Sequence, residues 1–157
     1  MRIAGSGHQG LPQRTAKLVD AALREVLAQH AGGIVGVTFL AGGADQLFAR
    51  AVLDLGGALE VIVPAEQYRD GLSVEAQRGY DELIGKAAGV ERLPLIESTE
   101  EAHMAAGRVL VDGADMVVAV WDSKPARGLG GTADVVAYAR DRGVPVLVVW
   151  PPGATRD

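Results

Sequence analysis

Short apolar runs alternate along this chain with longer segments whose apolar residues recur at helical spacing. The runs are rich in valine, isoleucine and leucine and lack a clean alternation with polar residues, a pattern typical of parallel strands that are covered on both faces. A chain in which such strands alternate with helices folds into a mostly parallel α/β sheet. The expected strands are Arg2–Gly5, Gly36–Ala41, Leu59–Val63, Val90–Leu95, Met116–Trp121 and Val144–Trp150.

The segments between these runs carry the helices. Leu18, Ala22 and Val26 follow one another at four-residue intervals, as on the buried face of an amphipathic helix. We therefore predict one domain, residues 1–157, with the α/β fold of a three-layer sandwich. Its six-stranded, mostly parallel sheet has helices on both faces and the strand order 4-3-2-1-5-6. The other helical segments are expected near residues 47–55, 74–88, 100–111 and 132–142.

Glycine makes up 21 of the 157 residues, or about 13%, against a usual share of roughly 7%. Part of this excess has a structural explanation, because the expected helices run into glycines, which favour the left-handed conformation that ends many helices. Eight further glycines form three clusters that follow expected strands and precede expected helices. The helix-ending set is Gly32, Gly33, Gly56, Gly57, Gly89, Gly113 and Gly143, and the clusters are Gly5, Gly7 and Gly10, then Gly42 and Gly43, then Gly128, Gly130 and Gly131.

Positions of this kind lie together at the edge of a parallel sheet where the carboxyl ends of its strands meet, and such sheets bind ligands there. Glycine lets backbone N–H groups approach a ligand closely, and helix N-termini favour anions. The three clusters therefore predict a site for a ligand that carries phosphate or ribose. The alternative is that tight strand-to-helix turns use glycine whatever the function.

The first cluster reads Gly5-Ser6-Gly7-His8-Gln9-Gly10 and has the spacing of a dinucleotide-binding fingerprint. We set the NAD interpretation aside, because that fingerprint needs an acidic residue at the end of the second strand to hold the ribose, and this strand ends in alanine and glycine. We assign Gly5, Ser6 and Gly7 to ligand binding. His8 either contacts phosphate or acts as an acid or base, or it is an ordinary loop histidine.

The second cluster precedes Asp45, which stands at the opening of a helix. One explanation of Asp45 is the favourable interaction of a carboxylate with the positive end of the helix dipole. The other is that Asp45 accepts hydrogen bonds from ligand hydroxyls, since a carboxylate repels phosphate. We expect Gly42 and Gly43 to supply backbone N–H groups to the same ligand.

The third cluster lies in a polar loop between a buried strand and a helix. Lys124 and Arg127 in this loop either neutralise a ligand anion or are solvated charges. Asp122 ends the strand and is a candidate for ligand contact or catalysis. Thr132 is expected to cap the helix or to donate its hydroxyl to phosphate. The candidate backbone donors of this loop are Gly130 and Gly131.

Aromatic and histidine side chains elsewhere are weaker candidates for ligand binding. Tyr68 and Arg69 follow the third expected strand and could close over a ligand. His103 is expected to be packed or exposed on its helix. Trp121 and Trp150 end neighbouring strands, and the sequence leaves open whether they serve the core, an interface or base stacking.

The absence of cysteine and the net charge of −5 exclude several classes of function. Without cysteine there is no disulfide, no thiolate zinc site and no thiol nucleophile, and no spacing of histidine and acidic residues indicates another metal site. The acidic balance argues against a nucleic-acid partner, which needs a basic face. Since no apolar run has the length of a membrane span and no signal peptide is seen, we expect a cytoplasmic protein with no membrane contact, no metal and no cofactor.

Three short motifs carry a resemblance to a known superfamily. Residues 39–45 read Phe-Leu-Ala-Gly-Gly-Ala-Asp, residues 114–121 are followed by a Gly-Gly-Thr turn at 130–132, and residues 5–7 read Gly-Ser-Gly. These segments resemble the superfamily that joins the Rossmann domain of the DNA-processing protein A (Smf) to the Lonely Guy phosphoribohydrolases. The resemblance implies a SLOG-like Rossmann sheet, a nucleotide or nucleotide-derived ligand across the three loops, and a homodimer.

The same resemblance defines an enzymatic alternative. The phosphoribohydrolases and the nucleoside deoxyribosyltransferases carry a glutamate three residues after the threonine of this turn, where this chain has Val135. Cleavage of an N-glycosidic bond needs a carboxylate to stabilise or trap an oxocarbenium-like centre. Asp134 is adjacent but turned by about 100° on a helix, and Asp122 matches the strand-end aspartate of the deoxyribosyltransferases.

The leading interpretation is a small cytoplasmic protein that binds a nucleotide or nucleotide-derived ligand at its glycine-rich loops. The alternative is an N-glycosidic hydrolase or transferase that uses Asp122 or Asp134 in place of the missing glutamate. A DNA-processing module is a third interpretation, which the acidic net charge disfavours.

Overall fold

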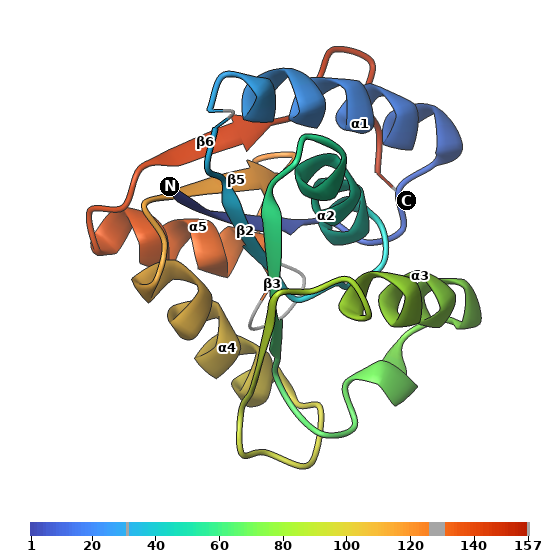
Figure 1. Ribbon diagram of the computed structural model, residues 1–157, viewed down its shortest axis with the longest axis vertical. Helices are drawn as coiled ribbons and strands as arrows, with labels where there is room; N and C mark the ends of the chain where they lie inside the picture. The colour runs from blue at the N-terminus through green and yellow to red at the C-terminus, as the bar shows by residue number, and fades with distance from the viewer. Residues whose placement is uncertain (31, 126–130, 157) are drawn as a thin grey trace.

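Six parallel strands form the sheet at the centre of the molecule (Figure 1). They are β1 (Arg2–Gly7), β2 (Val35–Thr38), β3 (Ala58–Val63), β4 (Gly89–Arg92), β5 (Met116–Val120) and β6 (Val146–Val149). The computed structural model describes residues 1–30, 32–125 and 131–156. The strand order is β4-β3-β2-β1-β5-β6 and every pairing is parallel, which confirms the predicted fold class and strand order.

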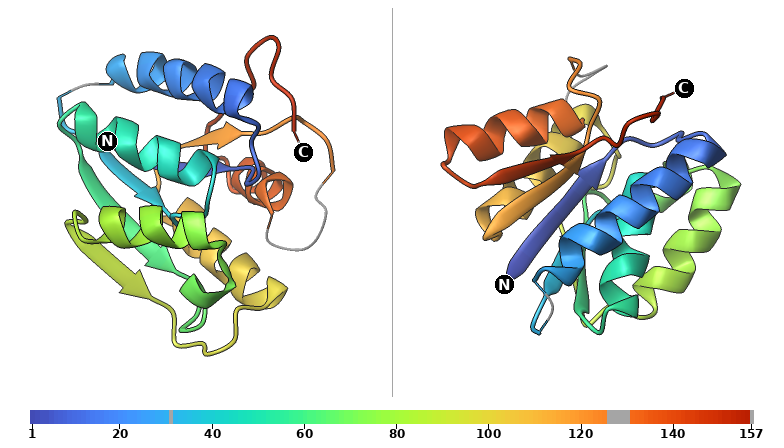
Figure 2. Two further views of the ribbon diagram at one scale, coloured as in Figure 1. Left: turned by 90° about the vertical axis from the view of Figure 1, so that its right-hand side faces the viewer. Right: turned by 90° about the horizontal axis from the view of Figure 1, so that it is seen from above.

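Helices cover both faces of this sheet and complete the three layers. One face carries α1 (Gln13–Ala28), α2 (Ala44–Asp54) and α3 (Val74–Ile84), and the other carries α4 (Glu100–Asp112) and α5 (Thr132–Asp141) (Figure 2). A short 3₁₀ helix, η1 (Arg69–Gly71), lies in the connection from β3 to α3. In the described part of the chain, the helices are too short or too polar to cross a membrane.

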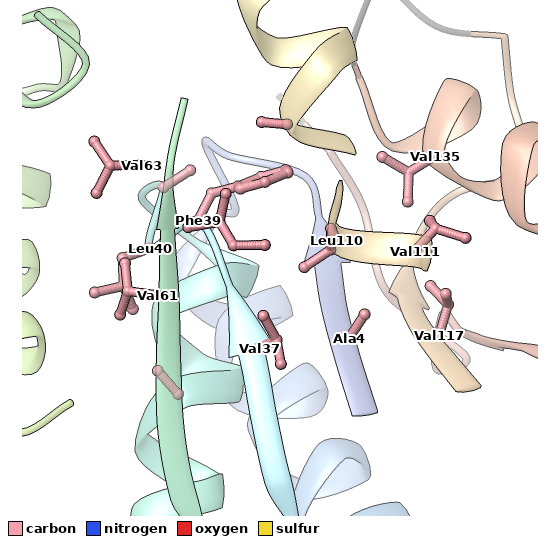
Figure 3. Close-up of a cluster of buried hydrophobic side chains, with 14 of the residues drawn as sticks. Ala4, Val37, Phe39, Leu40, Val61, Val63, Leu110, Val111, Val117 and Val135 are labelled. Atoms are coloured by element: carbon pink, nitrogen blue, oxygen red, sulfur yellow. The ribbon is translucent and has the colours of Figure 1, made fainter. Parts of the chain in front are cut away.

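The face under α4 and α5 holds a continuous apolar core (Figure 3). Ala4, Val37 and Val117 lie on three adjacent strands and are at most 2% exposed. They belong to the same buried cluster as Leu110 and Val111 of α4. Because these strands are covered on both faces, polar residues are scarce in them, and this accounts for the apolar runs without alternation in the sequence.

Close packing of α2 on the sheet depends on glycines, of which Gly5 and Gly36 are two. A Cβ atom on Gly5 would lie 2.3 Å from Cδ1 of Phe48, and one on Gly36 would lie 2.6 Å from Cγ2 of Val52. Both distances are far shorter than the roughly 3.5–4.0 Å of a carbon–carbon contact. The two glycines therefore let α2 approach β1 and β2. Gly5, a candidate for ligand binding, has a packing role that needs no ligand.

The helix ends differ from the sequence-based expectation at four positions, one of which is Gly57, whose φ is not in the left-handed region. Gly89 begins β4 instead of ending a helix, and Gly113 follows α4 with a right-handed φ of −89°. Thr132 is the first residue of α5, and the residue that caps this helix is Gly131. The capping role expected for Thr132 is therefore wrong. The glycines that have the expected positive φ are Gly32, Gly33, Gly56 and Gly143.

Candidate functional site

The three strand-to-helix loops meet at the carboxyl edge of the sheet around a small cavity, which we call the edge cavity. Its volume is about 80 Å³, a fraction of the roughly 300–1,000 Å³ of ordinary small-molecule sites. The edge cavity can therefore hold a part of a ligand, such as a sugar, but not a whole nucleotide. Its lining includes Ser6, Gly7, Asp45, Tyr68, His103, Gly131 and Thr132.

Asp45 places a buried carboxyl group in the wall of the edge cavity. The side chain is on the first turn of α2, and the residue is 3% exposed. Its Oδ2 accepts a hydrogen bond from the N–H of Ala41 at 3.2 Å, but its Oδ1 has no hydrogen-bond partner among the described residues. Burial raises the pKa of Asp45 to about 7, although the nearby N–H groups of Ala41 and Gly7 and the hydroxyl of Thr38 act in the opposite direction.

A tight turn after β2 holds Asp45 in this position. Leu40 has a φ of 58° and Gly43 a φ of 78°, in the left-handed region that side chains disfavour. Gly43 also approaches the first loop so closely that a Cβ atom would lie 2.7 Å from the carbonyl oxygen of His8. The N–H of Ala44 donates to the same oxygen at 3.1 Å. This contact ties the start of α2 to the loop after β1 and requires glycine at position 43.

Tyr68 and His103 form another wall of the edge cavity. Their ring centroids are 5.6 Å apart in an edge-to-face arrangement, and Nε2 of His103 lies 2.8 Å from the hydroxyl oxygen of Ser98. Burial raises the pKa of the Tyr68 hydroxyl well above its usual value, and the charge of Asp45 is a smaller cause in the same direction. Burial lowers the pKa of His103, so this imidazole is neutral at pH 7.

This wall is held by backbone pairing between two connections that are distant in the sequence. The N–H groups of Glu66 and Gln67 donate to the carbonyl oxygens of Leu95 and Ile96 at 2.8 and 2.9 Å. The pairing joins the segment before η1 to the segment before α4. The sequence identified the first segment as a possible cover for the ligand but missed His103, whose position depends on this pairing.

His8 joins the first loop to the end of β5. It is 5% exposed; its backbone N–H donates to the carbonyl of Val120 at 3.2 Å, and its Nε2 accepts from the N–H of Asp122 at 3.0 Å. Oδ1 of Asp122 lies 3.2 Å from the same Nε2. Burial acts to raise the pKa of Asp122, but the N–H of Lys124, the imidazole of His8 and the guanidinium of Arg156 outweigh it, and the pKa lies below its usual value.

Comparison with known proteins identifies solved structures that share this architecture. No family model matches the chain and no curated protein matches its sequence. DNA processing protein A from Streptococcus pneumoniae matches 94% of this chain and 49% of its own length, with a TM-score of 0.69 and 19% identity. The corresponding protein from Helicobacter pylori matches 99% of this chain and 68% of its own, with a TM-score of 0.71 and 14% identity. The chain has a SLOG-type Rossmann-like fold.

A third SLOG-type neighbour binds a different ligand. The molybdenum cofactor binding protein from the phototrophic bacterium Rippkaea orientalis matches 94% of this chain and 74% of its own, with a TM-score of 0.58 and 17% identity. Sequence identities this low show only that the folds are alike. They confirm the fold that the sequence motifs imply, while the ligands of these proteins remain statements about those proteins.

The SLOG fold corrects the sequence-based argument against nucleic acid. The Helicobacter pylori structure concerns a single-stranded DNA binding mode, so a protein with this fold binds DNA. The acidic net charge was therefore the wrong ground for setting a nucleic-acid partner aside. Net charge sums over the whole surface, whereas helix N-termini and a few local donors are enough to contact phosphates.

Gly42 and Gly43 lie away from the edge cavity. They line a neighbouring groove of about 480 Å³ beside the start of α2, and Gln9 lines both hollows. Arg50 supplies a cation to this groove, but its Nη1 pairs with Glu82 at 3.3 Å. The SLOG-type sheet thus brings parts of all three loops together, while the glycines of the second loop face a separate hollow.

The remaining candidates of the third loop do not converge on the edge cavity. Lys124 is exposed, and its carbonyl accepts a hydrogen bond from the Trp121 indole at 2.9 Å. Asp134 lies in the first turn of α5 but is not among the residues that line the cavity. Val135, where the resemblance to the phosphoribohydrolases implies a glutamate, is 3% exposed and packs in the core. The candidates Arg127, Gly128 and Gly130 lie outside the described residues.

Proposed function

We propose that this chain is a small cytoplasmic protein that binds a nucleotide or nucleotide-derived ligand where its three strand-to-helix loops meet. The observation that carries the proposal is the edge cavity itself, which has a buried, incompletely bonded carboxyl group in its wall. Buried polar atoms in folded proteins are almost always hydrogen-bonded. An exception at a residue that lines a cavity supports a ligand site there.

The start of α5 supplies the complementary chemistry. Gly131 and Thr132 line the edge cavity, and a helix N-terminus offers backbone N–H groups and a positive dipole end to an anion. The hydroxyl of Thr132 adds a further donor. With a phosphate at this helix, only one further part of the ligand would enter the cavity toward Asp45, as its volume of about 80 Å³ requires.

Thermal unfolding with a ligand panel tests the proposal. The panel contains nucleoside mono-, di- and triphosphates, sugar nucleotides and the molybdenum cofactor, with inorganic phosphate as the reference for an anion alone. At about 100 times Kd a ligand stabilises by roughly 2.7 kcal/mol, and in a chain of this size Tm rises by about 2–4 °C per kcal/mol. We expect one class to raise Tm by at least about 5 °C. A flat response across the panel at 1 mM (on the order of the weakest useful affinity) would refute the proposal.

The molybdenum cofactor is included because a neighbour with this fold binds it. Within the described residues, no group of three or more histidine, cysteine, aspartate or glutamate side chains could hold a metal ion. This chain would therefore hold such a cofactor through its organic part, with the phosphate at the start of α5.

Thr132 offers a matched pair of variants that locates the binding site. Thr132→Val removes the hydroxyl, whereas Thr132→Ser keeps it. Since a hydrogen bond to a charged group contributes about 1.5–3 kcal/mol, we expect Thr132→Val to weaken binding of a phosphorylated ligand by at least about tenfold and Thr132→Ser to bind like the parent protein. Equal affinities in the two variants would contradict an anion site at α5.

Single-stranded DNA is the second candidate ligand, supported by the likeness to DNA processing protein A over nearly the whole chain. The test is fluorescence anisotropy of a labelled oligothymidine at several salt concentrations. Phosphate contacts give a linear fall of log K with log salt, with a slope of about −0.7 per phosphate neutralised for single strands. Binding that does not depend on salt, or no binding at low salt, would exclude this candidate.

A further inference from the structure

The two edges of the sheet differ in how they are protected. β4 and β6 are its outer strands, and each is four residues long. An outer strand has backbone N–H and C=O groups without a neighbouring strand, and charged residues commonly keep other chains from pairing with it. β4 carries Glu91 and Arg92, which are both exposed. β6 reads Val-Leu-Val-Val and carries no charge.

The uncharged stretch extends beyond β6 itself. Residues 144–150 read Val-Pro-Val-Leu-Val-Val-Trp, and Leu147 in the middle is 37% exposed. β5 lies along one side of β6, and no strand of the described chain lies along the other (Figure 1). An uncharged run rich in valine is the type of edge that further strands join. β6 is therefore the edge at which we expect a partner strand.

The register of β6 on β5 determines which of its backbone groups face outward. The N–H of Val117 donates to the carbonyl of Pro145 at 2.9 Å, and Val117 is paired with Val146. Alternate residues of a parallel strand bond to the same neighbour, so Leu147 is the next residue that bonds to β5. The N–H and C=O groups of Val146 and Val148 consequently point away from β5.

These outward groups match a second copy of the same strand. In an antiparallel pair, two facing residues exchange both of their hydrogen bonds, and the next two residues face each other without bonds. Within the bounds of β6, all the outward groups are used when Val146 of each copy faces Val148 of the other. Leu147 then faces Leu147 of the second copy on a two-fold axis.

We propose that β6 pairs antiparallel with β6 of a second copy of this chain, about a two-fold axis at Leu147. The pairing joins the two six-stranded sheets into one and covers a leucine that is exposed in the single chain. A two-fold interface closes on itself, so no β6 edge is left for a third copy. Because the strands of the two copies run in opposite directions, the two edge cavities lie at opposite edges of the joined sheet. The pairing is therefore independent of the proposed ligand.

Sedimentation velocity of the purified chain tests the pairing. A strand pair of this length is a small interface, so we expect a dissociation constant of about 1–100 µM and a dimer at about 200 µM protein. Leu147→Lys places two like charges opposite each other on the axis and should leave a monomer at every concentration. Leu55→Lys is the matched control, because Leu55 at the end of α2 is 36% exposed and should dimerise like the parent.

Val148→Pro is a second variant that acts on the backbone. Proline removes an N–H that faces outward and none that bonds to β5, a position at which edge strands tolerate it. We expect this variant to be monomeric and to unfold at the temperature of the Leu147→Lys monomer, as followed by circular dichroism.

An introduced thiol tests the register, since the chain has no cysteine. A residue on the two-fold axis lies opposite itself at a Cα separation of roughly 4.5 Å, which a disulfide can span. With oxidised glutathione as the oxidant, Leu147→Cys should form a linked dimer at least about tenfold faster than Val90→Cys, because pairing raises the effective concentration of its thiol. Val90 is the control residue, 40% exposed on β4.

Three results would overturn the proposal. A parent chain that stays monomeric at the highest concentration excludes self-pairing and leaves β6 as an edge for a strand of another protein. A dimer that persists in both Leu147→Lys and Val148→Pro has its interface elsewhere. Equal rates of linkage in Leu147→Cys and Val90→Cys show that Leu147 does not lie on the axis. None of these results bears on nucleotide binding, which the ligand panel tests separately.

Discussion

Replacing Asp45 by asparagine should change how the stability of the protein depends on pH. The folded protein holds the carboxyl group at a pKa of about 7, against an ordinary value of 3.8. A carboxyl group whose folded pKa is raised stabilises the fold while it is protonated, below pH 4. That stability is lost as pH rises from about 4 through 7, because the unfolded chain ionises freely and the folded chain does not.

The size of this effect follows from the two pKa values. A difference of about 3 pKa units at about 1.4 kcal/mol each gives a loss of about 4 kcal/mol between pH 4 and pH 8, as an order of magnitude. Asparagine has the same shape and cannot ionise. Its carbonyl oxygen can keep the hydrogen bond from the N–H of Ala41, and its amide then occupies the place of Oδ1.

The assay is urea unfolding followed by far-ultraviolet circular dichroism at pH 4, 5, 6, 7 and 8. We expect the parent protein and Asp45→Asn to have similar free energies of unfolding at pH 4, and the variant to be the more stable by several kcal/mol at pH 8. Other ionisable groups titrate in both proteins and cancel in the difference. Asp141→Asn, an exposed aspartate on α5, controls for the change in net charge. A difference between Asp45→Asn and the parent that stays constant with pH would refute a buried, destabilised carboxylate.

Three further predictions test the frame around the site. Gly5→Ala should destabilise by about 1–3 kcal/mol in urea unfolding, because the new methyl group overlaps an aromatic ring of α2, whereas Gly71→Ala meets open space and should change little. Asp122→Asn should lower the free energy of unfolding by about 1–3 kcal/mol at pH 7. Because the folded protein lowers the pKa of this carboxyl group, the difference between variant and parent should vanish as pH falls through that pKa. A difference that does not change with pH would show that the charge of Asp122 does not stabilise the fold. Nucleoside monophosphates and deoxynucleosides should stay intact on incubation with the protein, since Val135 is buried and Asp134 is outside the cavity lining; free base detected by chromatography would revive the enzymatic alternative.

The fold could be predicted from the sequence because its signals are local. The apolar runs without alternation marked strands that are covered on both faces, and four-residue apolar stripes marked the helices between them. The ends of elements were harder to predict: Gly89 and Gly113 look like left-handed, helix-ending glycines in the sequence. Gly89 instead begins β4, and Gly113 ends α4 with a right-handed φ.

The candidate site was only partly predictable, since its chemistry depends on contacts between distant segments. Gly5 and Gly7 look alike in the sequence, and a Cβ atom on either would collide with α2, but of the two only Gly7 also lines the edge cavity. The sequence offered two explanations of Asp45, a helix-dipole partner and a hydroxyl acceptor. Its burial and its unpartnered oxygen come from the walls around it, and no local pattern encodes them. His103 was missed for the same reason.

The backbone N–H groups around Asp45 are hydrogen-bonded, which sets its unpartnered Oδ1 apart. The N–H groups of His8, Ala41, Ala44 and Asp122 each have a hydrogen-bond acceptor within 3.2 Å, although they come from three different loops. A loosely packed edge would leave several such groups unbonded, because each depends on contact between loops. Here all four groups are bonded, and among the buried side-chain atoms of the described residues the deficit is confined to one oxygen of a residue that lines the cavity. A preorganised frame favours ligand binding at this edge, since little has to be ordered when a ligand binds.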